Sequence, residues 1–270
     1  MIGRGGGTAG RGGRRPLVVG NWKMHGGVAA LAELRVVDRW AVGRPDLDIA
    51  FALPAPLIMP AAQAYGAIAI GAQDVHWAAE GAFTGSVSAG MMREAGANFT
   101  LVGHSERRLG YGETDADIAA KVGTAQAHGL GVVLCIGERE RDATTSDRIA
   151  GLERQLLAGL AKSDPAALAI AYEPVWAIGT GHVPDVGTIA EIAAALAQAW
   201  ARRFGDRDAR LRLLYGGSVI PENAAALMAI DGIDGLLVGG ASLAGATFLD
   251  LCQQAAGRPV RADSSRTEVA

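Results

Sequence analysis

The stretch Val132-Val133-Leu134-Cys135-Ile136 decides the fold class, because it is a short apolar run without a single polar residue. It is followed by Gly137-Glu138, then by a stretch of helical character at Arg148–Ala161, and then by another apolar run at Leu168–Ala171. A continuous apolar run between helices indicates a strand that is buried on both faces of a parallel sheet. This strand–helix–strand unit is the repeating element of α/β proteins.

The same unit recurs along the chain. The short apolar runs are Leu17–Asn21, Ile49–Leu53, Ala67–Gly71, Phe99–Val102, Val132–Ile136, Leu168–Ala171, Leu211–Tyr215 and Leu236–Val238. The stretches of helical character between them include Val28–Trp40, Asp115–His128, Arg148–Ala161 and Val186–Phe204. Eight repeats in a chain of this length favour a closed (β/α)8 TIM barrel with eight parallel strands. A doubly wound open sheet stays open as the alternative, because periodicity does not separate the two.

Composition narrows the class of protein. Half of the 270 residues are hydrophobic but only 5% are aromatic, so we expect a core built mainly from Ala, Val, Leu and Ile. A formal net charge of −3 gives no general attraction for nucleic acid or membrane. Two cysteines do not make a disulfide framework and fit a reducing compartment, and no apolar run is long enough to span a bilayer. We therefore expect a cytoplasmic protein.

The two ends of the chain differ from the rest. Residues 1–15 are rich in Gly and Arg, and residues 258–270 are polar, so we expect two disordered tails around a single catalytic domain over residues 16–257. The first tail contains Gly5-x-Gly7-x-x-Gly10, a formal dinucleotide fingerprint, but no strand precedes it, and we interpret it as chance. RNA binding through the Arg-Gly residues is the other interpretation of this tail.

In a (β/α)8 barrel the chemistry lies at the carboxyl ends of the strands. Polar and glycine residues gather just after the apolar runs, at Asn21-Trp22-Lys23, Gln73-Asp74, His104-Ser105-Glu106, Gly137-Glu138, Glu173-Pro174, Gly216-Gly217-Ser218 and Gly239-Gly240. These residues are the candidates for the functional site.

Three of these side chains carry the chemistry that the site would need. Glu173 ends an apolar run and suits a general base, although a glutamate in a surface ion pair would look the same. Lys23 is able to balance a phosphate or a developing enolate, but a lone lysine is usually solvated. His104 suits an acid or an electrophile, while a structural histidine is the ordinary alternative.

The glycine segments predict the other half of the site. Gly216-Gly217-Ser218 and Gly239-Gly240 follow the seventh and eighth apolar runs and precede expected helix starts, where backbone N–H groups bind anions. Many barrels hold a phosphate after these two strands, and we favour that interpretation over two ordinary tight turns. Ala177-Ile178-Gly179-Thr180-Gly181 is small and flexible, and is either a lid over a ligand or a plain loop.

Taken together, these motifs resemble those of the triosephosphate isomerase family. The resemblance covers about Pro16 to Gly257, in the family's order. The segments that carry it are Asn21–Met24, Gly81–Gly85, Gly103–Arg108, Ala171–Gly181, Tyr215–Ser218 and Leu237–Leu243. It implies an isomerase that interconverts dihydroxyacetone phosphate and D-glyceraldehyde 3-phosphate through an enediolate, in glycolysis and gluconeogenesis, without a cofactor or metal.

The resemblance also implies a role for each catalytic residue. Glu173 is expected to carry a proton between C1 and C2 of the substrate. His104 is expected to act as a neutral imidazole that polarises the carbonyl, and Lys23 to supply positive charge to the enediolate.

The remaining site residues follow from the same resemblance. Asn21 is expected to help position the substrate, Ser105 to hold the base while the lid is open, and Glu106 to support Lys23. The phosphate is expected to bind backbone N–H groups, which belong to Gly179, Ser218, Gly239 and Gly240.

The family further implies a homodimer, in which the third loop, with Thr84, inserts into the partner subunit. The chain departs from the family at three positions. Pro184 removes a backbone N–H that in the family helps hold the closed lid against the tyrosine matching Tyr215, so we expect closure to rely more on Ser218 and Gly181. Ser86 replaces an acidic residue that in the family pairs with an arginine across the dimer, so we expect Arg107 to lack that partner and the dimer to be weaker. Asp74 replaces a frequent Asn, with no predicted consequence.

Other functions compete with the one that this resemblance implies. A paralogous isomerase of a four-carbon ketose phosphate, erythrulose phosphate, in sugar-alcohol catabolism would use the same residues and remains the alternative. A barrel that only binds phosphorylated ligands would not need Glu173, His104 and Lys23 together. A hydrolase elbow, Gly-x-Ser-x-Gly, is missing, and the five histidines are dispersed without a His-Glu-x-x-His pair. We therefore expect no metal and no nucleic-acid or membrane partner.

Overall fold

The computed structural model describes residues 15–160, 163–205 and 211–257 as a closed barrel. Its strands follow the chain order around the barrel, and all pair in parallel, with β1 closing on β8 where Leu17 lies opposite Gly235. The strands are β1 Leu17–Asn21, β2 Asp48–Leu53, β3 Ala69–Ala72, β4 Phe99–Val102, β5 Gly131–Ile136, β6 Leu168–Tyr172, β7 Leu213–Tyr215 and β8 Gly235–Val238. The predicted eight-stranded barrel is confirmed, and the open sheet is wrong.

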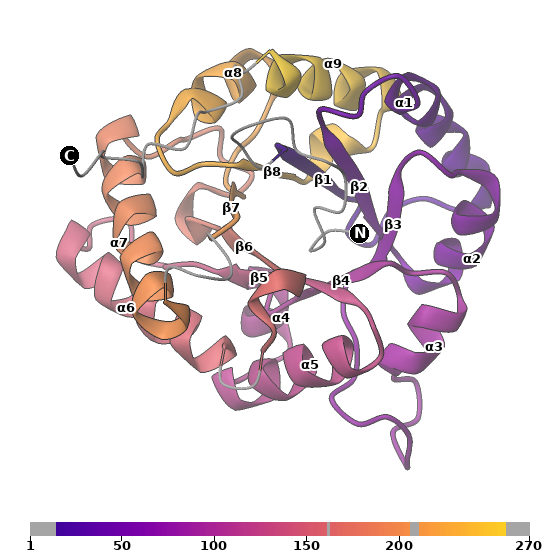
Figure 1. The fold of residues 1–270 in the computed structure, drawn as a ribbon, viewed down its shortest axis with the longest axis horizontal. Coiled ribbons are helices and arrows are strands. Elements are labelled where there is room, and N and C mark those ends of the chain that lie inside the picture. The colour runs from indigo at the N-terminus through magenta and orange to yellow at the C-terminus, as the bar shows by residue number, and fades with distance from the viewer. Residues whose placement is uncertain (1–14, 161–162, 206–210, 258–270) are drawn as a thin grey trace, which may run out of the picture.

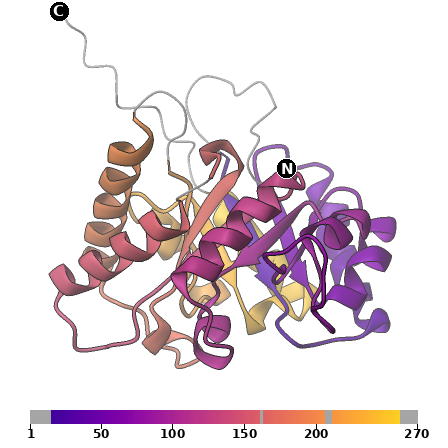
Figure 2. The ribbon, with the colours of Figure 1, turned by 90° about the horizontal axis from the view of Figure 1, so that it is seen from below.

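Helices surround the barrel as an outer ring (Figure 1), and Figure 2 shows them from the side. The α-helices are α1 Leu34–Ala41, α2 Ala55–Ala64, α3 Ala89–Glu94, α4 Ser105–Gly110, α5 Asp115–Ala127, α6 Thr145–Gly159, α7 Val186–Phe204, α8 Pro221–Ala229 and α9 Gly245–Ala256. The described part of the chain also contains four short 3-10 helices, η1 Val28–Glu33, η2 Pro165–Ala167, η3 Val175–Ala177 and η4 Gly240–Ser242.

Some boundaries differ from the prediction for local physical reasons. The predicted helix over Val28–Trp40 is a 3-10 helix as far as Glu33 and an α-helix only from Leu34. Helix α6 begins three residues before the predicted start, because the Thr144 side chain caps it by accepting the backbone N–H of Asp147. Helix α2 was not predicted, and Pro60 lies inside it, where proline normally disfavours a helix.

The core has two parts, separated by the wall of the barrel. The inner part fills the barrel with Leu17, Val19, Ala50, Ala52, Phe99, Leu101, Val133, Cys135, Ala169, Ala171, Leu214 and Leu237. The outer part lies between the strands and the helices. Small residues are needed beside the one inner aromatic ring: a Cβ on Gly71 would lie 2.3 Å from the ring of Phe99. The predicted aliphatic core is confirmed.

The predicted tails lie almost entirely outside the described residues, which begin at Arg15 and end at Gly257. The two cysteines, Cys135 and Cys252, are buried and free. Among the helices in the described ranges, none is both long and apolar enough to cross a membrane.

Candidate active site

A cavity of about 210 Å³ opens at the carboxyl ends of the strands. Eight of the predicted site residues line it: Asn21, Lys23, His104, Glu173, Gly179, Ser218, Gly239 and Gly240. They come from segments up to 219 positions apart (240 minus 21), and the barrel brings them together because every parallel strand ends at the same rim.

Glu173 is the buried acid of this cavity. It follows β6 directly, and only 2% of its side chain is exposed. One carboxylate oxygen, Oε2, accepts the backbone N–H of Ser105 at 3.0 Å, and the other, Oε1, lies 3.2 Å from Nε2 of His104. The carboxylate is therefore held at the carboxyl end of β4 by two donors, and no lysine or arginine in the described ranges pairs with it.

The partners of the two ring nitrogens of His104 indicate which of them carries a proton. It caps helix α4, and its Nδ1 accepts the backbone N–H of Glu106 at 3.3 Å. An Nδ1 that accepts a hydrogen bond carries no proton, so the proton of the neutral ring lies on Nε2, which faces Glu173. The ring is thus arranged as a neutral donor that points into the cavity.

Lys23 is held in an unusual backbone conformation. Its φ of +53° makes it the one non-glycine residue with positive φ in the described ranges, a conformation that costs energy and persists only where neighbours hold it. The N–H of Lys23 donates to Oδ1 of Asn21 at 3.0 Å, and its carbonyl accepts the Nε2 amide of Gln73 at 2.8 Å. Its Nζ lies 2.7 Å from Oε1 of Glu106.

Gln73 is a candidate position of the sequence for which no role was predicted. Its side-chain amide donates to the carbonyls of both Lys23 and Ala52. It ties the catalytic-site segment after β1 to the ends of β2 and β3. Its position directly after the third apolar run was the only signal that the sequence contained.

The predicted lid, Ala177–Gly181, begins at the last residue of η3. Trp176 donates its indole Nε1–H to Oε1 of Glu138 at 3.0 Å, and the Tyr172 hydroxyl donates to the same oxygen at 3.1 Å. Burial raises the pKa of Glu138 above its ordinary range, although both donors and Arg148 work against that shift. This carboxylate therefore holds Trp176, the residue just before the predicted lid.

The lid contact that the sequence places in doubt is the one between Tyr215 and the backbone at Pro184. The hydroxyl of Tyr215 is buried without a hydrogen-bond partner in the described parts of the chain. Pro184, just after the predicted lid, has no N–H to offer it. The hydroxyl lies in a tight place, since a Cβ on Gly217 would come within 2.3 Å of it.

Arg107 has two acidic partners within its own chain, while its pairing across a dimer stays a prediction. Its guanidinium lies 3.0 Å from Oδ2 of Asp74 and 2.5 Å from Oε1 of Glu113. Asp74, the departure without a predicted consequence, supplies one of these two carboxylates. The counter-charge of Arg107 is therefore found inside its own chain.

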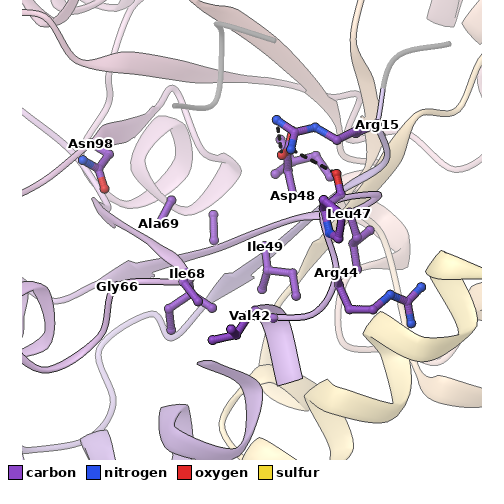
Figure 3. A pocket seen from close by; sticks show the side chains of 15 residues that line it. Arg15, Val42, Arg44, Leu47, Asp48, Ile49, Gly66, Ile68, Ala69 and Asn98 are labelled. Atoms are coloured by element: carbon purple, nitrogen blue, oxygen red, sulfur yellow. Dashed lines mark hydrogen bonds and ion pairs between the residues drawn. The ribbon is translucent and has the colours of Figure 1, made fainter. Parts of the chain in front are cut away.

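A larger cavity, of about 390 Å³, lies at the opposite end of the barrel, where β1, β2 and β3 begin (Figure 3). Its arginines are already paired, Arg15 with Asp48 and Arg44 with Asp46. It holds none of the predicted site residues. We therefore assign the chemistry to the smaller cavity.

Comparison with known proteins identifies the family of the chain. The family described as triosephosphate isomerase matches residues 16–255. The chain belongs to the triosephosphate isomerase family.

Individual members of the triosephosphate isomerase family match over nearly their whole length. The triosephosphate isomerase of Ruegeria sp. is 48% identical over 238 residues, which cover 87% of this chain and 95% of the relative. That of Afipia carboxidovorans is 46% identical, with 88% and 97% covered. The crystal structure of triosephosphate isomerase from Bartonella henselae superposes with a TM-score of 0.82 at 38% identity, and 89% of this chain and 99% of that one are covered.

Two supporting residues and the predicted interface residue of the triosephosphate isomerase pattern lie outside the cavity lining. Ser105 contacts Glu173 through its backbone N–H, and Glu106 pairs with Lys23 although 54% of its side chain is exposed. Thr84 belongs to the exposed segment between β3 and α3, which projects from the body of the molecule (Figure 1).

Proposed function

We propose that this chain interconverts dihydroxyacetone phosphate and D-glyceraldehyde 3-phosphate by proton transfer through an enediolate. One observation carries the proposal: a buried carboxylate, a neutral imidazole and an ammonium group face the same small cavity, and glycine segments line its other end. Moving a proton between adjacent carbons needs a base, a donor to the carbonyl oxygen and a positive charge at once.

Glu173 is the base in this proposal. Its carboxylate takes a proton from one substrate carbon and returns it to the neighbouring one. The Ser105 N–H holds Oε2 while the site is empty of substrate, so binding has to release the carboxylate toward the carbon.

His104 is the donor to the substrate oxygens. The Glu106 N–H on its Nδ1 keeps the proton on Nε2, the atom that faces the cavity. A neutral imidazole is able both to donate this proton to an enediolate oxygen and to accept one from the neighbouring hydroxyl. It therefore moves protons between the two oxygens, while Glu173 moves the proton between the two carbons.

Lys23 stabilises the negative charge that develops on the enediolate. Its carbonyl and N–H are fixed by Gln73 and Asn21, which sets the direction of the side chain. Glu106 pairs with the ammonium group in the free enzyme and holds it at the rim of the cavity. Asn21 also lines the cavity, and we assign it to substrate positioning.

The glycine end of the cavity holds the phosphate. Backbone N–H groups of Gly179, Ser218, Gly239 and Gly240 supply donors without a bulky side chain, and this is the environment that an anion prefers. Gly179 belongs to the lid, so a bound phosphate draws the lid over the site. Closure excludes water, which protects the reactive enediolate phosphate.

We propose a homodimer, formed by the segment between β3 and α3. Three rings gather in this segment: His76 lies 4.1 Å from Phe83 and 4.7 Å from Trp77 between ring centroids. Trp77 and Phe83 are 44% and 37% exposed, a poor arrangement for aromatic rings that face only water. Thr84 follows Phe83 in this segment and is exposed. We propose the reducing cytoplasm as the compartment of the dimer.

A coupled isomerase assay on the purified full-length chain tests the proposed function. Glyceraldehyde 3-phosphate and erythrulose phosphate are offered in parallel, with Glu173→Gln as the control. Fast turnover of the triose phosphate that is lost in the variant supports the proposal. Turnover of the four-carbon substrate alone would overturn the substrate assignment but keep the mechanism.

A further inference from the structure

Four charged side chains form a closed ring next to the candidate active site. Asp74 contacts Arg107 at 3.0 Å and Lys121 at 2.7 Å. Glu113 contacts the same two cations, each at 2.5 Å. Two cations and two carboxylates leave the ring with no net charge. Each member therefore has two partners of opposite sign.

The ring is largely shielded from water. The side chains of Lys121 and Glu113 are 6% and 7% exposed, and those of Asp74 and Arg107 are 21% and 28% exposed. Charges at such positions are tolerated only when they are paired, and removing one partner leaves an uncompensated charge behind. The ring consequently resists changes in the relative position of the segments that carry it.

These segments are the ones that hold the catalytic groups. Asp74 directly follows Gln73, whose amide holds the carbonyl of Lys23. Arg107 lies in helix α4, which His104 caps. The ring therefore links the holder of the ammonium group to the helix that orients the imidazole.

We propose that Asp74 is a positioning residue that fixes Lys23 relative to His104 through this ring. Lys23 needs such a constraint, because its backbone has a φ of +53° and would relax if Gln73 moved. Misplacement of a catalytic group by about 1 Å is able to cost on the order of 100-fold in rate. The proposal rests on the roles assigned above to Lys23 and His104.

Asp48 provides a matched control at the other end of the barrel. Its side chain is 22% exposed, close to the 21% of Asp74, and it also pairs with two cations, Arg15 and Arg212. Figure 3 shows its contact with Arg15 in the cavity remote from the catalytic groups. Loss of this carboxylate removes a comparable pair of ionic contacts without touching the ring.

The experiment compares Asp74→Asn, Asp48→Asn and Asp74→Glu in the full chain. Each variant is assayed at a concentration where its elution volume in size-exclusion chromatography equals that of the wild type. Phosphoglycolate serves as a probe whose carboxylate mimics the enediolate charge, and inorganic phosphate as a probe of the glycine end alone. We expect Asp74→Asn to lower kcat/KM by ~10- to 100-fold and to weaken phosphoglycolate binding, with phosphate binding unchanged. Asp74→Glu should restore part of both, and Asp48→Asn should change neither.

Equal effects of Asp74→Asn and Asp48→Asn, or equal weakening of both probes, would overturn the proposal. If Asp74→Asn does not fold, Arg107→Gln opens the ring on its more exposed side and must show the same selective loss of phosphoglycolate binding. A wild-type chain without isomerase activity would refute the proposed function instead. An active wild type with an unaffected Asp74→Asn variant refutes only the positioning role.

Discussion

Nε2 of His104 lies 3.2 Å from Oε1 of Glu173, so the proposed proton donor and the proposed base face each other in the empty cavity. This geometry places the groups for two steps of one reaction side by side, namely proton donation to the carbonyl oxygen and proton removal from carbon. Substrate that enters between them must take the imidazole proton onto its carbonyl oxygen and present a carbon to the carboxylate. Neither group is useful alone, because the carbon acid becomes reactive only when its carbonyl is polarised.

Glu173→Gln should lower kcat by on the order of 10²- to 10⁴-fold, because the amide keeps the shape of the side chain but no longer accepts a proton from carbon. Steady-state kinetics in both directions measure the effect. Glu140→Gln, an exposed position in the loop after β5, is the control and should behave like the wild type. A Glu173→Gln enzyme within about tenfold of wild type would remove Glu173 from the role of base.

Glu138→Gln should change how stability depends on pH. Burial raises the folded-state pKa of Glu138 above its ordinary value of 4.5, so the folded state binds this proton more tightly than the unfolded state does. The stabilising contribution is therefore complete below about pH 4.5 and is lost as the pH rises through the folded-state pKa.

Urea unfolding at a series of pH values tests this sign. The wild type should lose stability relative to Glu138→Gln as the pH rises from 4.5, and the difference should level off above the folded-state pKa. Glu140→Gln corrects for the general effect of one negative charge. A difference that grows in favour of the wild type with rising pH would show that Tyr172 and Trp176 stabilise the charged form more than burial disfavours it.

Pro184, just after the predicted lid, and Tyr215, the last residue of β7, form a second testable pair. Since the Tyr215 hydroxyl has no partner in the described parts of the chain, Tyr215→Phe should leave lid kinetics and KM almost unchanged. Pro184→Ala restores a backbone N–H just after the predicted lid, and in that background the hydroxyl gains a possible donor. We expect the two substitutions to be coupled, with Pro184→Ala lowering KM by up to about tenfold only when Tyr215 is present.

Stopped-flow ligand binding and steady-state KM values on the four chains of this cycle measure the coupling. Strict additivity would mean that the lid closes without using the Tyr215 hydroxyl in either background. A loss of activity in Tyr215→Phe alone would show that the hydroxyl makes a contact that the enzyme needs, and would contradict the claim that it has no partner in the described parts of the chain.

The proposed dimer depends on the aromatic segment after β3. Phe83→Ala removes a ring that contacts both His76 and Trp77, and we expect the dimer dissociation constant to rise by on the order of 10- to 100-fold. Sedimentation equilibrium measures it. Met59→Ala, an exposed apolar residue on α2 outside this segment, is the control. An unchanged dissociation constant would move the interface elsewhere.

The sequence was sufficient to predict the barrel because its signal is local. Each buried parallel strand appears as an apolar run, and β1, β4 and α7 have the predicted bounds. Helix α2 escaped prediction because its interior Pro60 and weak apolar period contradict the usual helix signals. Local patterns therefore predict elements well only where propensity and packing agree.

The candidate site was predictable as a set of residues but not as a set of contacts. The motif positions placed Glu173, His104 and Lys23 at strand ends, and the structure places all three at one cavity. The ion pair of Arg107 with Asp74 joins positions 33 apart (107 minus 74), and nothing in the sequence around either residue indicates it. For that reason the intrachain partners of Arg107 were not predicted, and neither was the backbone strain of Lys23.

Isomerisation in D₂O, with the product analysed by NMR, is the most direct test of proton transfer by Glu173. A carboxylate that carries the proton exchanges it with solvent, so we expect deuterium at the carbon next to the carbonyl in a substantial part of the product. Glu173→Gln should form neither product nor deuterated substrate at a comparable rate. Full turnover without any deuterium would indicate a hydride shift and would contradict the proposed mechanism.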